Sequence, residues 1–346
     1  MIYRFDEIAI NSTAKKKPVE SDKFHYIGLE HIDSGTFEIS RWGSDVAPIG
    51  EKLIMKKGDV LFGKRRAYQR KVAIAPIDGI FSAHGMVLRP KEDVICKEFF
   101  PFFMSSNQFM DTAIRISVGG LSPTINWKDL QKQEFELPPI EEQRVLAEKL
   151  WAAYELKEAY RKMIAATDEM VKSQFIEMFK GDDQVPLGDI CNIEKGATIT
   201  RNDVLPGDIP VVAGGQEPSC YHNVANREAG AITVSASGAY AGFINLWSCP
   251  IFASDCNTVI SKDAEKTDQT FVYFGLKAMQ KQIYGLQKGG AQPHVYGKDL
   301  QKFMFPHPAY AKQIEFSKMA KQADKSKFEL RQAIDKIDKV MKSLLQ

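Results

Sequence analysis

Two long stretches of the chain carry apolar residues at steps of three and four, the spacing of one face of a helix. In the first, residues 143–180, the apolar positions are Leu146, Leu150, Ala153, Leu156, Tyr160, Met163, Thr167, Val171, Phe175 and Met178. The second runs to Gln346 through Phe316, Ala320, Ala323, Leu330, Ile334, Ile337, Met341 and Leu344, with Lys327 interrupting the stripe. The first helix would be roughly 57 Å long, which exceeds the span of a small domain. We therefore expect the two helices to pair with each other and run antiparallel; the alternative is that each packs only on its own domain.

Short runs of β-forming residues, broken by Gly, Pro, Asp and Asn, precede each predicted helix. Residues 72–75, 231–234 and 257–260 are examples, and helical patches follow at residues 99–110 and 271–283. A last strand near residues 134–137 is stopped by Pro138 and Pro139, since proline cannot donate to a strand ladder. This pattern predicts β-rich domains, mixed or antiparallel, with small helices. Asn126 is expected to cap a short helix at residues 127–130.

The chain contains an internal repeat. Residues 118–132 align without a gap with residues 288–302, and both segments contain a glycine pair followed by Pro and later by Asp-Leu-Gln-Lys. Looser matches lie upstream, where residues 57–62, 80–83 and 5–8 resemble residues 229–234, 251–254 and 187–190. A period of about 170 residues is too long for a solenoid repeat, so it indicates two copies of a domain plus its following helix. The copies agree in framework and differ in between, as expected of a scaffold with two binding surfaces related by a pseudo-two-fold axis.

Composition is that of a soluble globular protein, with 44% hydrophobic and 26% charged residues in 346 positions. The longest strongly apolar run, residues 99–104, is too short to cross a bilayer, and early acids rule out a secretory signal. We therefore expect a cytoplasmic protein without a membrane partner. The five cysteines show no Cys-x-x-Cys spacing, which favours reduced thiols over a metal or redox site.

Positive charge is concentrated in one segment. The formal net charge is only +2, yet residues 56–71 contain seven Lys and Arg side chains against one acid, Asp59. Such a cluster is typical of a surface where nucleic-acid phosphates dock. The candidate DNA-binding residues here are Lys64, Arg65, Arg66, Tyr68, Arg70 and Lys71, with His84 as a further base reader. Arginine offers a bidentate fork to guanine; the alternative is a solvated loop without a DNA role.

The corresponding segment of the second copy, residues 235–242, has small hydroxyl residues and glycines instead. Ser235, Ser237 and Tyr240 are its candidate DNA contacts, and Tyr240 falls near the position of Tyr68. Lys288 and His294 flank the second glycine pair and are candidates for phosphate contacts. Because the two loops differ in chemistry, we expect two different half-sites.

Catalytic signatures are missing from the sequence. The proline pair at Pro138 lacks the Asx/Ser and aromatic neighbours of an amino-methyltransferase tetrapeptide, and no dinucleotide-binding or Walker A glycine loop occurs. The six histidines are scattered. The sequence therefore predicts neither a catalytic residue nor a cofactor or metal held by this chain.

The junctions between β domain and helix carry a family resemblance. Pro138-Pro139-Ile140-Glu141-Glu142-Gln143, preceded by Ser122-Pro123-Thr124-Ile125-Asn126-Trp127-Lys128-Asp129-Leu130, resembles the domain-to-helix junction of type I restriction–modification specificity subunits. The second junction, residues 306–313, lacks the acids. The resemblance implies an α+β chain in which two β-rich target recognition domains are joined by two long antiparallel helices. Its expected parts are residues 1–140 (target recognition domain 1), 141–181 (spacer helix 1), 182–308 (target recognition domain 2) and 309–346 (spacer helix 2).

The same resemblance implies a function. Each β domain would read one half of a bipartite double-stranded DNA target, and the helices would set the gap between the halves. Two modification subunits, which bind S-adenosylmethionine and methylate adenine, would clamp on the helices, with restriction subunits as optional further partners. This chain itself would be non-catalytic. Two alternatives stay open: the specificity subunit of a fused, type IIB-like system, and a coiled-coil scaffold that binds proteins.

Overall fold

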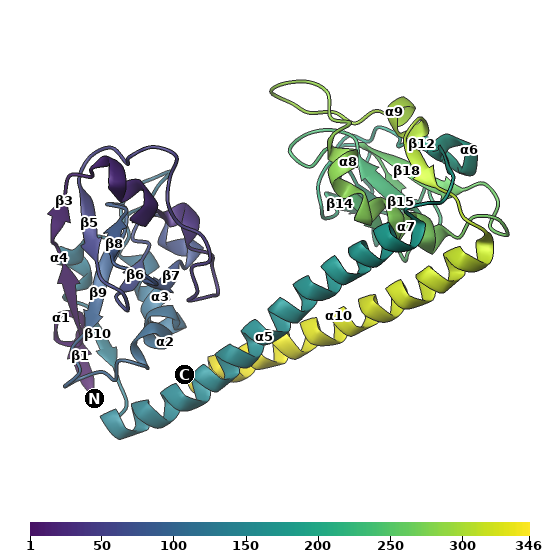
Figure 1. Ribbon diagram of the computed structural model, residues 1–346. Helices are drawn as coiled ribbons and strands as arrows, with labels where there is room; N and C mark the ends of the chain where they lie inside the picture. The colour runs from purple at the N-terminus through teal and green to yellow at the C-terminus, as the bar shows by residue number, and fades with distance from the viewer. The chain divides into compact units, whose positions relative to one another are not determined.

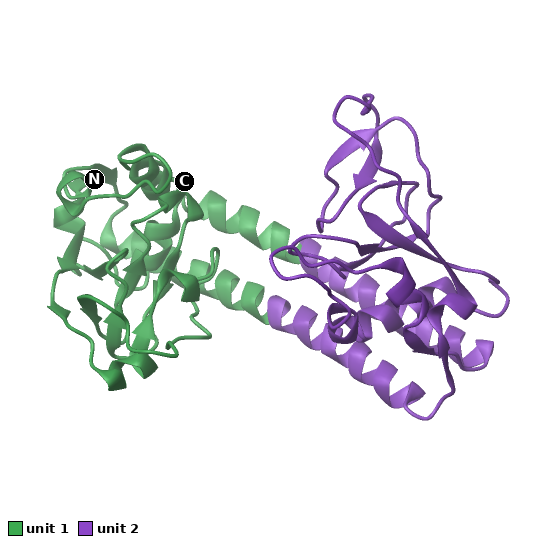
Figure 2. Ribbon diagram, turned by 90° about the horizontal axis from the view of Figure 1, so that it is seen from above, with its two compact units in different colours: residues 1–159, 333–346 green, residues 160–332 purple.

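The computed structural model describes residues 1–346, which form two compact units (Figure 2). Unit 1 comprises residues 1–159 and 333–346, and unit 2 comprises residues 160–332. Each unit therefore contains one β-rich module together with part of both long helices, α5 (Ile140–Phe179) and α10 (Tyr310–Leu344). This is the α+β organisation that the sequence predicted.

The module of unit 1 consists of short elements. They are β1 (Ile2–Arg4), α1 (Phe5–Ile8), β2 (Ala9–Ser12), β3 (Lys15–Lys16), η1 (Glu20–His25), β4 (Tyr26–Ile27), η2 (Leu29–His31), β5 (Lys52–Met55), β6 (Val60–Phe62), η3 (Ala67–Gln69), β7 (Val72–Ile74), β8 (Gly79–Phe81), β9 (Met86–Pro90), α2 (Phe100–Ser105), α3 (Asn107–Arg115), α4 (Trp127–Leu130) and β10 (Glu134–Glu136). Two four-stranded sheets, in the orders β2-β9-β6-β7 and β3-β5-β8-β4, form its body, and β1 pairs with β10.

Unit 2 contains a corresponding set of helices and strands. Its elements are β11 (Gln184–Pro186), α6 (Leu187–Ile190), β12 (Cys191–Lys195), β13 (Ile209–Val212), β14 (Cys220–His222), β15 (Ile232–Ser235), β16 (Ile244–Leu246), β17 (Phe252–Ala253), β18 (Cys256–Ser261), α7 (Gln269–Ala278), α8 (Gln280–Tyr284), α9 (Gly297–Gln301) and β19 (Met304–Pro306). The sheet orders are β12-β18-β15-β16 and β14-β13-β17, and β11 pairs with β19.

The two modules share one topology, which confirms the duplication. In unit 1 β6 pairs with β7 through Val60 opposite Ile74, and in unit 2 β15 pairs with β16 through Ile232 opposite Leu246. Each module also has one parallel pair, β4 with β8 and β13 with β17. The second sheets differ: where β5 runs beside β8 in unit 1, unit 2 keeps only a single bridge between Arg227 and Ile251. The copies therefore diverge in this second sheet and in the loops.

Each core continues from its module into one end of a long helix. In unit 1, Phe5, Phe109 and Phe135 cluster with ring centroids 5.3–5.8 Å apart, and Ala147 and Leu150 of α5 belong to the same cluster.

In unit 2, Phe175 of α5 and Phe316 of α10 pack with Phe271 and Phe305. Aromatic pairs of this kind contribute about 0.5–1.5 kcal/mol beyond the area they bury, so the helix ends are integral parts of the modules.

Within each unit the two long helices lie side by side and run in opposite directions (Figure 1). In unit 1 the end of α10 returns to the start of α5, where Met341 and Leu344 pack on the core cluster that contains Leu150. In unit 2 the start of α10 meets the end of α5, with the rings of Phe316 and Phe175 5.4 Å apart. This confirms the predicted antiparallel pairing and excludes helices that pack only on their own domains.

The predicted stripe of α5 is wrong in its middle. Leu156 and Met163 are about half exposed, whereas Lys157 is buried and its Nζ lies 2.8 Å from Asp338 Oδ1. Lys327 is likewise a buried member of the α10 stripe, with Nζ 2.5 Å from Asp168 Oδ1. The two ion pairs are 170 residues apart in both partners, so they are copies of one contact in the duplicated unit. The seam between the helices contains charge pairs where the sequence pattern predicted apolar contacts.

A buried glutamine fixes each module to its helix. Gln143 and Gln313, 170 residues apart, both lie in the first turn of a long helix and are almost fully buried. The Oε1 atom of each accepts one backbone N–H, and Nε2 donates to two backbone carbonyls. The partners are Cys96, Val94 and Pro138 for Gln143, and Asp268, Lys266 and Pro308 for Gln313. The junction is therefore built identically in both copies, although the second lacks the acidic residues of the first.

Asn126 stands at the N-cap position of α4 as expected, but its side chain makes no capping hydrogen bond. Its Nδ2 instead donates to Asp129 Oδ2 at 3.4 Å. In each glycine pair the first residue has a left-handed backbone, since Gly119 and Gly289 have φ of +114° and +98°.

Candidate nucleic-acid interface

The basic loop of unit 1, residues 63–71, connects β6 to β7 around the short helix η3. Arg66 and Arg70 flank η3 with φ of 58° and 51°, and they are the only non-glycine residues of the chain with positive φ. Tyr68, at the centre of η3, is 53% exposed. The loop thus presents an aromatic ring between two arginines whose backbone is held in a costly conformation.

A second loop, which we call the glycine-pair loop (residues 117–126), supports the backbone of the basic loop. Arg66 N donates to Pro123 O at 2.7 Å, and Ile125 N donates to Lys64 O at 3.0 Å. The guanidinium of Arg66 also lies 3.2 Å from Ser122 Oγ through both Nε and Nη2. The two loops therefore form one continuous surface.

Two of the predicted contacts point towards the protein itself. Arg70 Nη2 donates to Asn107 Oδ1 at 2.6 Å, and Lys71 Nζ donates to Leu29 O at 2.6 Å in a half-buried setting. Arg70 and Lys71 are therefore placed to hold the loop, whereas Arg66 and Tyr68 stand on its exposed side.

His84 lies against this loop, with Nε2 3.4 Å from Arg65 Nη1. Burial, followed by the positive charges of Arg65, Lys64 and Lys52, lowers the pKa of His84. Burial also lowers the pKa of Lys64, and the neighbouring Lys15 adds to the effect. Because like charges act on each other here, the surface is a concentrated patch of positive potential.

Lys15 and Lys52 also belong to this patch, although the sequence pattern did not predict them. They come from the paired strands β3 and β5, which are distant in sequence from the basic loop. The run Lys15-Lys16-Lys17 was a signal that could have identified the first of them.

Unit 2 repeats the backbone of this surface, and residues 287–296 are its glycine-pair loop. Gly238 N donates to Pro293 O at 3.0 Å and Val295 N donates to Ala236 O at 2.9 Å, the counterparts of the contacts of Arg66 and Lys64. Gly238 and Gly242, with φ of 80° and 89°, stand where unit 1 has Arg66 and Arg70. Tyr240 occupies the position of Tyr68 and is 47% exposed. The two tyrosines are therefore equivalent in the fold.

The predicted residues of unit 2 do not all reach this surface. Ser235 is buried in β15, so its side chain is not available to DNA, and we withdraw it from the candidate contacts. Ser237 Oγ donates to Asp255 Oδ2, and its backbone is bridged to His294. Ser237 and His294 thus lie together, and Tyr240 follows Ser237 on the same loop.

Lys288 reaches the same loop pair, since its backbone is bridged to His294, but its Nζ lies 2.7 Å from Asp299 Oδ2. The ring of His294 stacks on Tyr296 at 5.9 Å, and Lys298 Nζ lies 5.6 Å above the ring of Tyr296. Tyr296 and Lys298 were not predicted, although an aromatic residue between His294 and a lysine was a visible signal. Unit 2 therefore presents more aromatic and less cationic character than unit 1.

The cysteines do not assemble into a reactive or metal-binding site. Burial raises the pKa of both Cys191 and Cys256 to about 12, which keeps these thiols protonated. No group of three or more His, Cys, Asp and Glu side chains is arranged to hold a metal ion.

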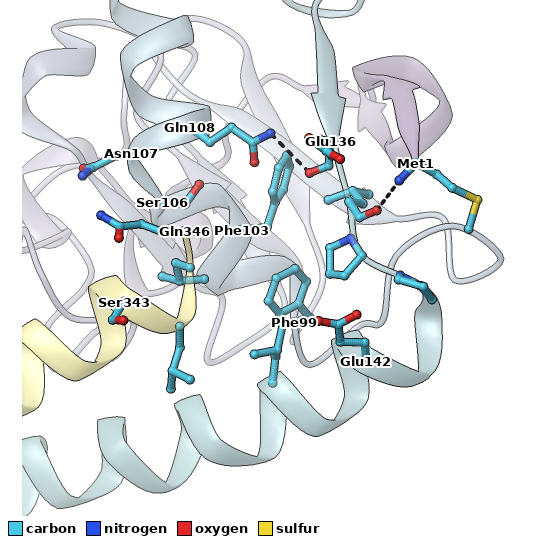
Figure 3. A pocket seen from close by; sticks show the side chains of 16 residues that line it. Met1, Phe99, Phe103, Ser106, Asn107, Gln108, Glu136, Glu142, Ser343 and Gln346 are labelled. Carbon is cyan, nitrogen blue, oxygen red and sulfur yellow. Dashed lines mark hydrogen bonds between the residues drawn. The ribbon is translucent and has the colours of Figure 1, made fainter.

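A pocket of about 770 Å³ lies within unit 1, between the start of α5, the end of α10 and helices α2 and α3 (Figure 3). Phe99, Phe103 and Leu146 line it, with Glu136 and Glu142 as its acidic members. The counterparts of Phe99 and Leu146 in unit 2 are Phe271 and Phe316, which contact the ring of Phe179. In unit 2 an aromatic ring therefore packs against the counterparts of two residues that line the pocket.

The chain contains two copies of one β module, joined through paired helices. Each copy has an exposed tyrosine on a loop that the glycine-pair loop supports. These features define a duplicated recognition scaffold. The chain belongs to the family described as type I restriction modification DNA specificity domain, whose model matches residues 7–163 and 181–339. This is a non-catalytic family. None of the helices combines the length and the apolar character needed to cross a bilayer.

Three similar proteins come from type I restriction–modification systems. The type I restriction enzyme EcoDI specificity subunit of Escherichia coli is 25% identical over 185 residues, which cover 52% of this chain and 41% of that subunit. The crystal structure of a type I restriction–modification S subunit from M. genitalium covers 100% of this chain and 94% of its own, with a TM-score of 0.62 and 16% identity. A chain from a study of assembly and conformational transition of the type I system gives a TM-score of 0.55 at 18% identity, covering 100% of this chain and 96% of its own. The two structures share the fold of this chain.

Proposed function

We propose that this chain reads DNA for a type I restriction–modification complex, with each module recognising one half of a bipartite target. The chain would position the methylating subunits without catalysing the reaction itself. The observation that carries this proposal is Arg66, an exposed arginine held in left-handed backbone conformation in the basic loop of unit 1.

An L-residue other than glycine in this conformation costs about 1–2 kcal/mol. Unit 2 has glycine at the position of Arg66, Gly238, so the fold itself does not need a side chain there. Strain of this kind is concentrated at functional sites, because the side chain is needed for something other than folding. Arginine on an exposed loop beside Lys64, Arg65 and Lys15 suits contacts with phosphates and guanine edges.

The residues divide into roles according to where their side chains point. Arg65, Arg66, Tyr68 and His84 contact DNA in unit 1, while Lys64 contributes charge. Arg70 and Lys71 hold the loop against Asn107 and Leu29.

In unit 2, Ser237, Tyr240, Lys288 and His294 form the corresponding contact surface. Because one surface is cationic and the other is largely aromatic and hydroxylic, the two half-sites differ in sequence.

The long helices serve the partners. Leu156 in unit 1, and Met163 and Met170 in unit 2, are about half exposed on α5, and they offer apolar surface to two modification subunits. S-adenosylmethionine would be bound by those subunits, and restriction subunits would join the same complex. On this proposal residues 1–140 and 182–308 are the target recognition domains, and residues 141–181 and 309–346 are the spacer helices.

The test uses the complex of the full chain with a modification subunit of the type I system. Arg66→Gly keeps the left-handed backbone and removes only the side chain. We expect weaker DNA binding, a salt dependence lowered by about one counterion if Arg66 contacts a phosphate, and relaxed methylation at one half-site only. Lys97→Gly, at an exposed lysine of the turn before α2, is the matched control and should change none of these. Unchanged affinity, salt dependence and methylation pattern in Arg66→Gly would overturn the proposal.

A further inference from the structure

The second glycine of each glycine-pair loop has no structural reason to be glycine. Gly119 and Gly289 are needed for their positive φ. Gly120 and Gly290 lie outside the left-handed region, and a Cβ built on either would meet no atom within 4 Å. Neither the backbone nor the packing of this chain therefore excludes a side chain at these two positions.

The same unexplained glycine occurs in both copies, while the residues that follow it differ. Leu121 and Ser122 in unit 1 correspond to Ala291 and Gln292 in unit 2. Both loops thus keep glycine at this position although their other residues differ. Because the chain's own fold does not require this glycine, the requirement points to a binding partner outside the chain. Glycine is the residue that allows another backbone or a ligand to approach closely.

The residues around the two glycine-pair loops indicate which kind of ligand approaches Gly120 and Gly290. In unit 1 the loop is joined to the basic loop through Arg66 and Ser122. In unit 2 the loop carries Lys288 and is bridged through His294 to Ser237. The tip of the loop in unit 1 carries an exposed apolar side chain, since Leu121 is 98% exposed next to this cationic surface. An apolar side chain beside arginine is an arrangement that suits the methyl-bearing edges of a DNA groove.

We infer that the two glycine-pair loops are a second DNA-contacting element, with Gly120 and Gly290 as the points where the duplex comes closest to the protein backbone. This inference rests on the proposed function and extends it to a segment outside the basic loop. Leu121 supplies an apolar contact in the first half-site, and Ala291 leaves the corresponding contact small in the second.

The test compares three glycine-to-alanine variants in the assembled complex. Gly120→Ala and Gly290→Ala add one methyl group at the inferred contacts. Gly181→Ala is the matched control, because Gly181 also has open space around its Cβ and lies outside the left-handed region, but follows α5. All three should unfold at the temperature of the parent chain or slightly above it, since alanine restricts the unfolded chain more than glycine does.

We expect Gly120→Ala and Gly290→Ala each to weaken binding of the cognate duplex roughly tenfold, an effect of the size of one mismatched base pair. Gly120→Leu should weaken binding further, and Gly181→Ala should leave it unchanged. If Arg66→Gly weakens binding while Gly120→Ala and Gly290→Ala do not, the inference is wrong and the proposed function stands. If none of these variants affects DNA binding, both fail.

Discussion

Replacing Asp338 by asparagine should destabilise unit 1 more than replacing Asp168 destabilises unit 2, although the two carboxylates are equivalent in the duplicated fold. Lys157, whose side chain is 7% exposed, has its Nζ 2.8 Å from Asp338 Oδ1. Lys327 contacts two carboxylates, with Nζ 2.5 Å from Asp168 Oδ1 and 2.7 Å from Asp324 Oδ1. Burial alone would lower the pKa of Lys327, but hydrogen bonds to both carboxylates outweigh it, and the pKa is raised.

The magnitude follows from what each change leaves behind. Removing one partner of a fully buried ion pair costs about 3–5 kcal/mol, because the other charge stays buried and uncompensated. Asp338 is 38% exposed and asparagine retains an acceptor oxygen, so we reduce the expected cost to about 2 kcal/mol. Asp168→Asn leaves Lys327 with Asp324, and its cost should stay below about 1 kcal/mol.

For a unit of this size, 1 kcal/mol shifts Tm by about 2–4 °C. Asp338→Asn should therefore lower the Tm of unit 1 by about 4–8 °C, and Asp168→Asn should lower that of unit 2 by less than about half as much. Calorimetry of the full chain measures the transitions, and hydrogen exchange assigns each of them to a unit. Glu141→Gln is the control, because its pair with Arg144 is exposed and contributes little. A loss for Asp168→Asn equal to or larger than that for Asp338→Asn would refute this reasoning.

Two further predictions concern the pH response of the basic loop and the junction glutamines. Burial and Arg65 hold the pKa of His84 below its ordinary value, so His84 should contribute stability at neutral pH that is lost as the pH falls through its folded pKa. Its NMR titration midpoint should rise towards the ordinary value of about 6.5 in Arg65→Gln; a parent midpoint at or above that value contradicts the electrostatic argument. Gln143→Ala and Gln313→Ala each remove three hydrogen bonds to the backbone, made by an almost fully buried amide, and should each cost about 2–4 kcal/mol in urea denaturation. A loss under about 1 kcal/mol would mean that water replaces the amide.

The architecture was largely predictable, because it follows from periodic patterns in the amino-acid sequence. Apolar steps of three and four predicted both long helices, and the repeated glycine-pair segment predicted that the modules share a topology. The residues at which the two long helices contact each other were not fully predictable, because a pattern of apolar residues does not identify a buried lysine such as Lys157. Its burial depends on Asp338, a partner far away in sequence.

The candidate site was predictable only where neighbouring residues form it. Tyr68 and Tyr240 could be matched because they lie in aligned loops. Lys15 and Lys52 reach the basic patch through strand pairing between β3 and β5, which single-sequence reasoning did not foresee. Ser235 was misjudged because β15 is buried along its whole length, so the strand shows no alternation between an inner and an outer face.

The left-handed backbone at positions 66 and 70 also limits how this loop can diversify. Glycine, asparagine and aspartate enter such a conformation readily, whereas β-branched residues are strongly disfavoured. A combinatorial library that randomises both positions freely would therefore lose many members to misfolding of the loop rather than to poor recognition. Variation at Arg65 and Tyr68, where φ is negative, leaves the backbone intact, so new target preferences should be easiest to select there.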